Sequence, residues 1–172
     1  VLADAEEAVR HAERIGFPLV IKASAGGGGR GIRVVQAPHE IKEAFRAARA
    51  EALSAFGDDR LFCEGFVQDG RHIEIQIAGD KHGFVLALGP RDCSVQRRHQ
   101  KIIEEAPPPD LDVSAREEME SAAIALAKSV GYVGVGTVEF LLSAEGPRFL
   151  EINPRLQVEH GITEEITGID LV

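Results

Sequence analysis

Apolar residues in the first part of the chain recur at helical and strand spacings in turn. Residues 5–15 repeat them at helical spacing behind Asp4, a favourable N-cap, and the pattern stops at Gly16. Two short strand patterns and a second helical pattern come next, at 19–23, 32–35 and 40–56. A glycine-rich run at 25–31 separates the two strands, so we expect a strand–loop–strand flap within a small α+β unit.

A strictly alternating pattern follows at residues 72–78. Isoleucine occupies every second position, and the other face carries His72, Glu74 and Gln76. Such alternation predicts a half-buried antiparallel strand. A turn then leads into a second expected strand at residues 84–88.

One further helix is predicted between the two groups of strands. A basic stretch at 91–101 and the prolines at 107–109 precede it. Ser114 and Glu117 form a capping box, which is a sequence signature of a helix N-terminus. The helical pattern then continues to a stop at Gly131.

Two strand patterns around a turn centred on Glu145 predict a β-hairpin in the last third. The strands are expected at 133–143 and 148–152. If the hairpin is symmetric, Glu139 lies opposite Glu151, and Thr137 lies opposite Asn153.

Polar residues continue at every second position beyond this hairpin. They are Glu151, Asn153, Arg155, Gln157 and Glu159. We expect them on one side of an extended run. There Arg155 offers a planar fork for a carboxylate-like anion, and Glu159 can accept a proton from it. The alternative interpretation is a solvated edge strand.

The facing glutamates suggest a metal site. Two carboxylates about 5 Å apart on one sheet face repel each other by roughly 1 to 3 kcal/mol, and a cation between them removes that penalty. The oxygens of Glu139 and Glu151, with the neighbouring amide of Asn153, suit Mg²⁺ or Mn²⁺. The alternative is a solvated face with two unrelated glutamates.

The glycine-rich run suggests phosphate binding. Its amides are not covered by side chains, so they can approach phosphate oxygens, and Lys22 just before it supplies a positive charge. The run lacks both the P-loop ending and the dinucleotide-binding glycine pattern. A flexible surface linker would have the same composition, so the interpretation needs other motifs.

A transition-metal site is a separate possibility. His72, Glu74 and His99 are potential zinc ligands of a hydrolase, and Gln76 and Gln96 lie near them in sequence. Their strand spacing does not fix tetrahedral geometry, so ribose or phosphate hydrogen bonding and plain surface polarity remain open.

Composition and charge limit the classes of molecule that the chain is expected to bind. The chain has 172 residues, with 19 basic against 28 acidic side chains, a net charge of −9. This balance argues against nonspecific binding to nucleic acid or anionic membranes, and no apolar run is long enough for a membrane span. The chain begins at Val1 and has Met119 as its single methionine, so we expect a piece of a longer polypeptide.

Taken in order, these motifs resemble biotin carboxylase, the ATP-grasp component of biotin-dependent carboxylases. The resemblance covers essentially the whole chain. It rests on Lys22-Ala23-Ser24 with the glycine run, Arg71-His72-Ile73-Glu74-Ile75-Gln76, Arg91-Asp92-Cys93-Ser94, Gln96-Arg97-Arg98-His99-Gln100-Lys101, Glu104-Glu105-Ala106-Pro107, Glu151-Ile152-Asn153, Arg155-Leu156-Gln157-Val158-Glu159-His160 and Thr163-Glu164. Ala25, Pro154 and Gly161 depart from the commonest family pattern, and none of them removes a proposed ligand.

The resemblance implies an α+β ATP-grasp fold, with a small α+β lid and a larger antiparallel-sheet domain with helices. Residues 1–66 would be the lid subdomain and residues 67–172 the main catalytic subdomain, with family regions preceding Val1 and following Val172. In such enzymes MgATP phosphorylates bicarbonate to carboxyphosphate, and the carboxyl group passes to N1 of biotin. The isolated chain is expected to be inactive.

The resemblance also implies roles for individual residues. The ATP-binding set is Lys22, Gly26, Gly27, Gly28, Gly29, Gly31, Glu64, His72, Gln96 and His99. Two metal ions, Mg²⁺ or Mn²⁺, would be bound by Glu139, Glu151 and Asn153. Bicarbonate would be held by Arg155, Gln157 and Val158. The catalytic set is Lys101, which faces the transferred phosphoryl group, Arg155 and the base Glu159.

The implied partners are a biotin carboxyl carrier protein or domain and a carboxyltransferase subunit or domain. The full-length protein would be a homo-oligomer. It would be located in the cytoplasm, or in the mitochondrial matrix of a eukaryote. The parent would be an acyl-CoA carboxylase, as in fatty acid biosynthesis, or a pyruvate carboxylase. The acceptor, whether acetyl-CoA, propionyl-CoA, another acyl-CoA, pyruvate or urea, is set by the carboxyltransferase. The alternatives are a carbamoyl-phosphate synthase-like ligase, which Asn153-Pro154-Arg155 weakly supports, and a non-catalytic nucleotide-binding module.

Overall fold

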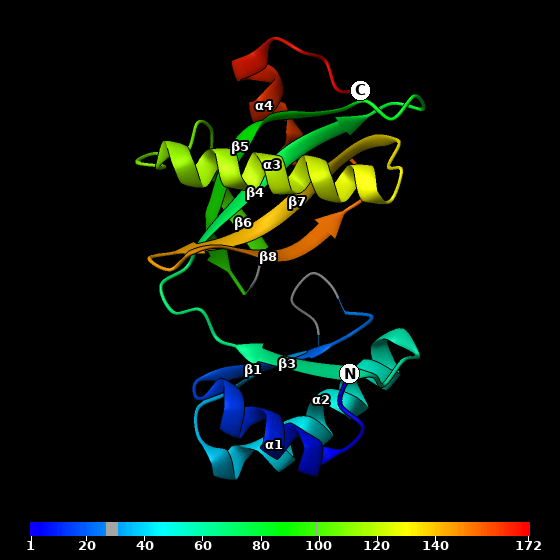
Figure 1. The fold of residues 1–172 in the computed structure, drawn as a ribbon, viewed down its shortest axis with the longest axis vertical. Coiled ribbons are helices and arrows are strands. Elements are labelled where there is room, and N and C mark those ends of the chain that lie inside the picture. The colour runs from blue at the N-terminus through cyan, green and yellow to red at the C-terminus, as the bar shows by residue number, and fades with distance from the viewer. Residues whose placement is uncertain (27–30, 99) are drawn as a thin grey trace. The chain divides into compact units, whose positions relative to one another are not determined.

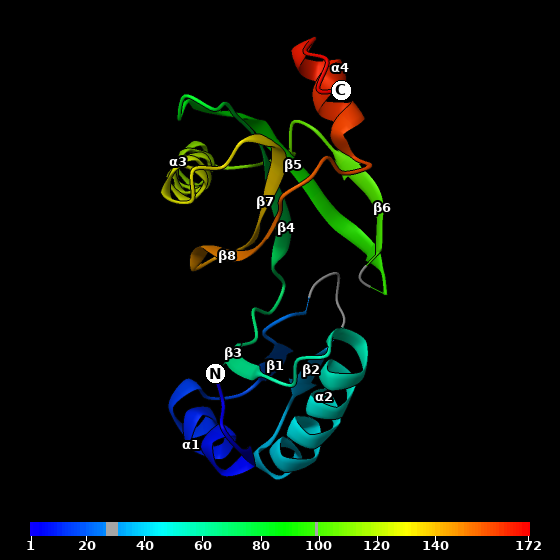
Figure 2. The same cartoon turned by 90° about the vertical axis from the view of Figure 1, so that its right-hand side faces the viewer.

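Two helices and a three-stranded antiparallel sheet form the first part of the computed structural model (Figures 1 and 2). The sheet has the order β2-β1-β3, and both pairs of strands are antiparallel. In chain order the elements are α1 (Ala5–Ile15), β1 (Leu19–Ala23), β2 (Ile32–Val35), the short 3₁₀ helix η1 (Pro38–Glu40), α2 (Ile41–Phe56) and β3 (Leu61–Gly65). The predicted elements of this region are confirmed, including the N-cap: Asp4 accepts a hydrogen bond from the amide of Glu7 at 2.7 Å.

The structure describes residues 1–26, 31–98 and 100–172, which form two compact units, 1–67 and 68–172. The α+β class with antiparallel sheets is confirmed in both. The roles of lid and catalytic subdomain stay predictions. In the described residues, no helix combines the length and the apolar character that crossing a membrane requires.

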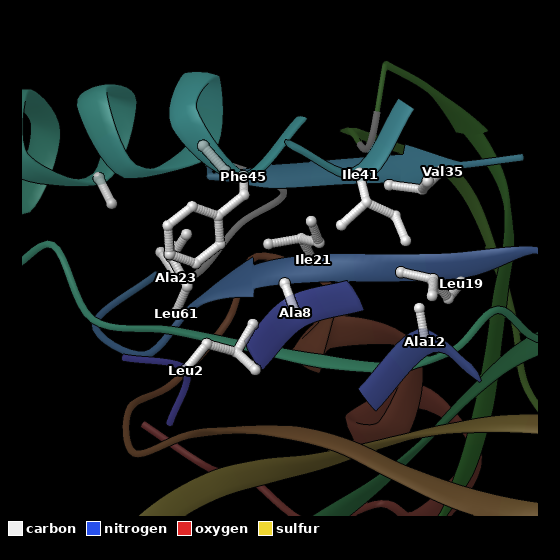
Figure 3. Close-up of a cluster of buried hydrophobic side chains, with 12 residues drawn as sticks. Leu2, Ala8, Ala12, Leu19, Ile21, Ala23, Val35, Ile41, Phe45 and Leu61 are labelled. Atoms are coloured by element: carbon white, nitrogen blue, oxygen red, sulfur yellow. The ribbon is translucent and has the colours of Figure 1, made fainter. Parts of the chain in front are cut away.

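The core of the first unit lies between its sheet and its helices (Figure 3). Ile41 and Phe45 of α2 and the small residues Ala8 and Ala12 of α1 pack with Ile21 of β1, and all of them are buried. Fully burying a large aliphatic or aromatic side chain stabilises a fold by about 1.5 to 3 kcal/mol. This core therefore provides much of the stability of the unit and holds the strands that flank the glycine-rich run.

Gly31 is the described glycine of that run whose replacement should cost most. Its φ of +71° lies in the left-handed region, and a Cβ there would come within 2.8 Å of the Cβ of Ala23. Gly57 is a matched control, because its φ is +68° with nothing within 4 Å. We expect Gly57→Ala to lower the free energy of unfolding by about 1 kcal/mol and Gly31→Ala by about 2 to 4 kcal/mol. Urea unfolding of the two variants measures the difference, and equal losses would show that the Ala23 contact is easily relieved.

The second unit is built on a five-stranded antiparallel sheet of order β6-β5-β4-β7-β8. Helix α3 lies across one face of this sheet (Figure 1). The apolar cluster of this unit includes Ile73, Ile75 and Ile77 of β4 and Met119 of α3. In chain order the elements are β4 (Arg71–Gly79), β5 (Val85–Arg97), β6 (Gln100–Glu105), α3 (Val113–Ser129), β7 (Gly134–Ser143), β8 (Gly146–Asn153) and α4 (His160–Thr167).

Two expectations for the first strands of this sheet are wrong. The strand expected at 84–88 extends to Arg97 as β5, and the end of the basic stretch lies in β6. The 72–78 strand is buried on both faces, since Glu74 and Gln76 have 0% exposure. Local alternation could not show this, because the groups that cover the polar face come from distant parts of the chain.

Two details of the following elements also differ. Asp112, and not Ser114, caps α3: its carboxylate accepts hydrogen bonds from the amides of Ser114 at 2.9 Å and Ala115 at 3.2 Å. A carboxylate at this position also interacts favourably with the helix dipole. The hairpin turn is centred between residues 144 and 145, because a register shift follows Glu139.

Candidate active site

A row of charged residues crosses four strands on the face of the second sheet opposite α3. Arg91 on β5 pairs with Glu74 on β4, Glu74 pairs with Glu139 on β7, and Glu139 pairs with Glu151 on β8. The predicted pairs of Glu139 with Glu151 and of Thr137 with Asn153 are confirmed. The sheet therefore brings three carboxylates and a guanidinium into one line.

Arg91 is completely buried at one end of this row, with 0% exposure. Its Nε donates to Glu74 Oε1 at 2.6 Å, and NH1 donates to Gln76 Oε1 at 2.7 Å and to Thr163 Oγ1 at 2.8 Å. NH2 donates to Thr137 Oγ1 at 3.3 Å. One side chain thus connects three strands and helix α4.

Lys101 of β6 lies among three carboxylates. Its ammonium group contacts Glu74 and donates to Glu139 Oε1 at 2.9 Å and to Glu159 Oε1 at 2.5 Å. Burial alone would lower the pKa of Lys101, but the negative charges of Glu74 and Glu139 and the hydrogen bonds hold it well above its ordinary value. Lys101 is therefore a firmly charged cation at neutral pH.

Glu139 is the most connected of the three carboxylates. Its Oε2 lies 3.0 Å from His72 Nε2, and its Oε1 accepts from Asn153 Nδ2 at 2.9 Å and from Gln157 Nε2 at 3.4 Å. Burial would raise its pKa, but the hydrogen bond from His72 and the charge of Lys101 lower the pKa to about 2. Glu139 is thus an ionised and almost fully buried carboxylate.

Gln96 orients the imidazole of His72. Its amide Nε2 lies 2.9 Å from His72 Nδ1 and donates to the carbonyl of Cys93 at 2.8 Å. Because an amide nitrogen is a donor, Nδ1 accepts this bond, and the other ring nitrogen, Nε2, lies 3.0 Å from Glu139 Oε2. Two residues of the predicted ATP set, His72 and Gln96, are thereby joined to the predicted metal ligand Glu139.

Glu159 reaches the cluster from a turn and not from a strand. Strand β8 ends at Asn153, and Glu159 precedes the first residue of α4. Burial would raise the pKa of Glu159, but the hydrogen bond and charge of Lys101 lower it. The carboxylate is therefore ionised and held at the ammonium group.

The expectation of one extended row through residues 151–159 is wrong beyond Asn153. Pro154 has no N–H to continue a strand ladder. Arg155 is exposed and donates to the carbonyl of Leu156 at 3.2 Å, whereas Gln157 is buried. Val158 is 94% exposed. These predicted bicarbonate ligands therefore face different surroundings.

The predicted phosphate-binding residues of the first unit form their own group. Lys22 and Glu64, on the adjacent strands β1 and β3, form an ion pair that the sequence did not indicate. Gly26 donates its amide to the carbonyl of Ala23 at 3.0 Å, and the carbonyl of Gly31 accepts from the amide of Ala23 at 3.0 Å. The remaining candidates lie outside the described residues: Gly27, Gly28, Gly29 and His99.

The donor set fits a hard divalent cation. Glu139 is ionised, Glu151 lies directly opposite it, and Asn153 adds an amide next to both. Oxygen ligands of this kind suit Mg²⁺ or Mn²⁺. Of the zinc interpretation, His72 and Glu74 lie close together with Glu139 as a third candidate ligand, whereas His99 lies outside the described residues. Both oxygens of Glu74 also contact the cations Arg91 and Lys101.

Comparisons with known proteins agree with this chemistry. Residues 1–172 match the family described as carbamoyl-phosphate synthase L chain, ATP binding domain. The chain is 56% identical over 173 positions to the mitochondrial propionyl-CoA carboxylase alpha chain of Homo sapiens, which covers 100% of this chain and 24% of that protein. It thus spans about a quarter of that curated relative.

Two solved structures are closely similar. One is a complex of biotin carboxylase from Campylobacter jejuni with β,γ-ATP, at a TM-score of 0.96 and 48% identity. The other is the biotin carboxylase domain dimer of 2-oxoglutarate carboxylase from Hydrogenobacter thermophilus with MgADP, ADP and bicarbonate, at a TM-score of 0.94 and 47% identity. Each likeness covers 99% of this chain and 38% of the other.

Proposed function

The chain belongs to the family of carbamoyl-phosphate synthase L chain ATP-binding domains, and we propose that it is the ATP-binding part of a biotin carboxylase. The observation that carries the proposal is the position of Lys101 among Glu74, Glu139 and Glu159. In this cluster Lys101 can contact a phosphoryl group, Glu139 can bind a divalent cation, and Glu159 can accept a proton. The carbamoyl-phosphate synthase-like and non-catalytic alternatives are not favoured, because the similar proteins are biotin-dependent carboxylases and biotin carboxylases.

The reaction joins bicarbonate to the terminal phosphoryl group of ATP. A bicarbonate oxygen attacks the γ-phosphorus, ADP leaves, and the bicarbonate proton passes to Glu159, which gives carboxyphosphate. Lys101 stabilises the charge that develops on the transferred phosphoryl group. Glu159 is suited to the role of base because it is ionised and faces the same space as Lys101.

Bicarbonate would be held next to this base by Arg155, Gln157 and Val158. The guanidinium of Arg155 supplies a forked donor, and Val158 offers its backbone amide. The buried Oε1 of Gln157 has no hydrogen-bond partner among the described residues, which supports a ligand at this position. Carboxyphosphate then yields CO₂ and phosphate, and N1 of biotin bonds to the carbon of CO₂ as its proton passes to the released phosphate.

Each unit, taken by itself, carries residues that we propose as ATP ligands. In the first unit, the proposed lid, these are Lys22, Glu64, Gly26, Gly31 and the intervening glycines 27–29. In the second they are His72, Gln96 and His99. The salt bridge with Glu64 holds the ammonium group of Lys22 beside β3, where it could exchange this partner for a phosphate oxygen. The Hydrogenobacter domain bound to MgADP and bicarbonate supports this ligand set.

Two Mg²⁺ or Mn²⁺ ions would be held by Glu139, Glu151 and Asn153. When bound, such an ion would offset the negative charge of the nucleotide phosphates. A carrier protein or domain would bring biotin to this site. A carboxyltransferase would then move the carboxyl group from biotin to the final acceptor and would determine which acceptor is used. The similarity to a propionyl-CoA carboxylase supports an acyl-CoA as the acceptor. That relative is a mitochondrial protein, which agrees with the mitochondrial matrix as one of the two proposed locations.

Release of ADP tests the proposal in the full-length protein that contains this chain. With MgATP present, we expect ADP release to depend on bicarbonate. Binding of MgATP without any bicarbonate-dependent release would contradict the enzyme assignment and support a nucleotide-binding module.

The metal assignment makes a separate prediction. Replacing Glu139 or Glu151 by Gln keeps the shape but removes an anionic oxygen, so the Mg²⁺ concentration for half-maximal ADP release should rise about tenfold or more. Glu145→Gln is a matched control in the exposed turn of the same hairpin. Titration of Mg²⁺ at fixed ATP measures the shift. If all three variants behaved as the wild type, the metal would bind elsewhere.

A further inference from the structure

Arg91 has no place in the nucleotide, metal or bicarbonate sets, although its environment is unusual. It is fully buried, and it donates to four different side chains. Removing a guanidinium group from water is costly unless its hydrogen bonds are replaced and its charge is paired. One of those bonds goes to Glu74, which also contacts Lys101. Another goes to Thr163, which lies in the helix that begins just after Glu159.

We propose that Arg91 is a positioning residue that fixes Lys101 and Glu159 relative to each other. The proposal rests on the proposed function, since it concerns the phosphoryl-binding cation and the base of that reaction. Arg91 acts through its neighbours and does not touch the substrates.

The connection to Lys101 passes through Glu74. Arg91 Nε bonds to Oε1 of this carboxylate, and Lys101 contacts Oε2. The guanidinium therefore sets the orientation of a carboxylate that is itself 0% exposed. Without that bond Glu74 is free to rotate and draw Lys101 away from Glu139 and Glu159.

The connection to Glu159 passes through helix α4. Thr163 lies in the first turns of the helix that begins just after Glu159, and its hydroxyl accepts from Arg91 NH1 at 2.8 Å. Thr163 is 1% exposed, so water cannot replace this bond. The bond thus ties the start of α4, and with it Glu159, to the strand that carries Arg91.

The test uses two variants of Thr163 in the full-length protein. Thr163→Val keeps the shape and removes the acceptor, whereas Thr163→Ser keeps the acceptor and removes a methyl group. Thr167→Val is a matched control on the same helix, because its hydroxyl bonds to the carbonyl of Thr163 and not to Arg91. The measurements are kcat and KM of bicarbonate-dependent ADP release, and hydrogen exchange of residues 160–167 without substrates.

We expect Thr163→Val to lower kcat and to speed amide exchange in α4 by about tenfold each, with the KM for MgATP unchanged. Thr163→Ser should restore both to within about twofold, because one acceptor oxygen is what Arg91 NH1 requires. A role in packing alone predicts the reverse order, and equal behaviour of the Val and Ser variants would overturn the proposal. If the wild type releases no ADP, the proposed function fails, and the exchange measurement alone decides the role of Arg91.

Discussion

Glu159→Gln is expected to lower bicarbonate-dependent ATP cleavage in the full-length enzyme by about 10² to 10⁴, the usual contribution of a general base. The amide keeps the size of the side chain and can still accept a hydrogen bond from Lys101, but it cannot take a proton. Glu159 is ionised in the structure because the hydrogen bond and charge of Lys101 outweigh its burial. Binding of MgATP should change little, since Glu159 is outside the proposed nucleotide set.

Steady-state ADP release and MgATP binding together measure this effect. Glu165→Gln is a suitable control, because it removes an exposed carboxylate from helix α4, which begins just after Glu159. Near wild-type cleavage in the Glu159 variant would show that the base lies elsewhere.

Lys101→Met is expected to lower the same reaction by about 10² to 10³, the effect of removing one group that stabilises developing charge. It should also destabilise the fold by about 3 to 5 kcal/mol, because buried carboxylates lose their shared cation. Lys128→Met, on the exposed side of α3, is the control. ADP release and urea unfolding at pH 7 measure the two effects.

The pH dependence of stability separates the charge of Lys101 from its packing. In the wild type the lowered pKa of Glu139 contributes stability that is present above its ordinary value of 4.5 and is lost as the pH falls through about 2. Without Lys101 the pKa values of Glu139 and Glu159 should rise, so acidification from pH 7 to pH 5 should restore part of the lost stability of the variant. A variant whose loss of stability is the same at both pH values would show that packing, and not charge, dominates.

Much of the site could be predicted because its pairs arise from local patterns. Alternation placed His72, Glu74 and Gln76 on one strand face. The symmetry of one hairpin gave the pair of Glu139 and Glu151. In both cases the relevant geometry is set within a strand or a single turn.

Other parts of the site depend on long-range pairing that no local pattern encodes. Arg91 bonds to Thr163, and Lys101 bonds to Glu159, across separations of 72 and 58 residues. Strand β8 ends at Asn153 because Pro154 has no N–H for the strand ladder. The alternation of polar residues continues past this proline and therefore wrongly predicted a longer extended row. The burial of Glu74 likewise depends on which strand becomes its neighbour, and that neighbour proved to be the basic stretch.

The most direct test of the central claim is transfer of carbon from labelled bicarbonate to biotin. The full-length protein is incubated with MgATP, labelled bicarbonate and its biotinylated carrier, and label on the carrier is counted. We expect label that requires MgATP, is lost in Glu159→Gln, and is accompanied by release of ADP. ATP-dependent ADP release without label on the carrier would contradict the assignment as a biotin carboxylase.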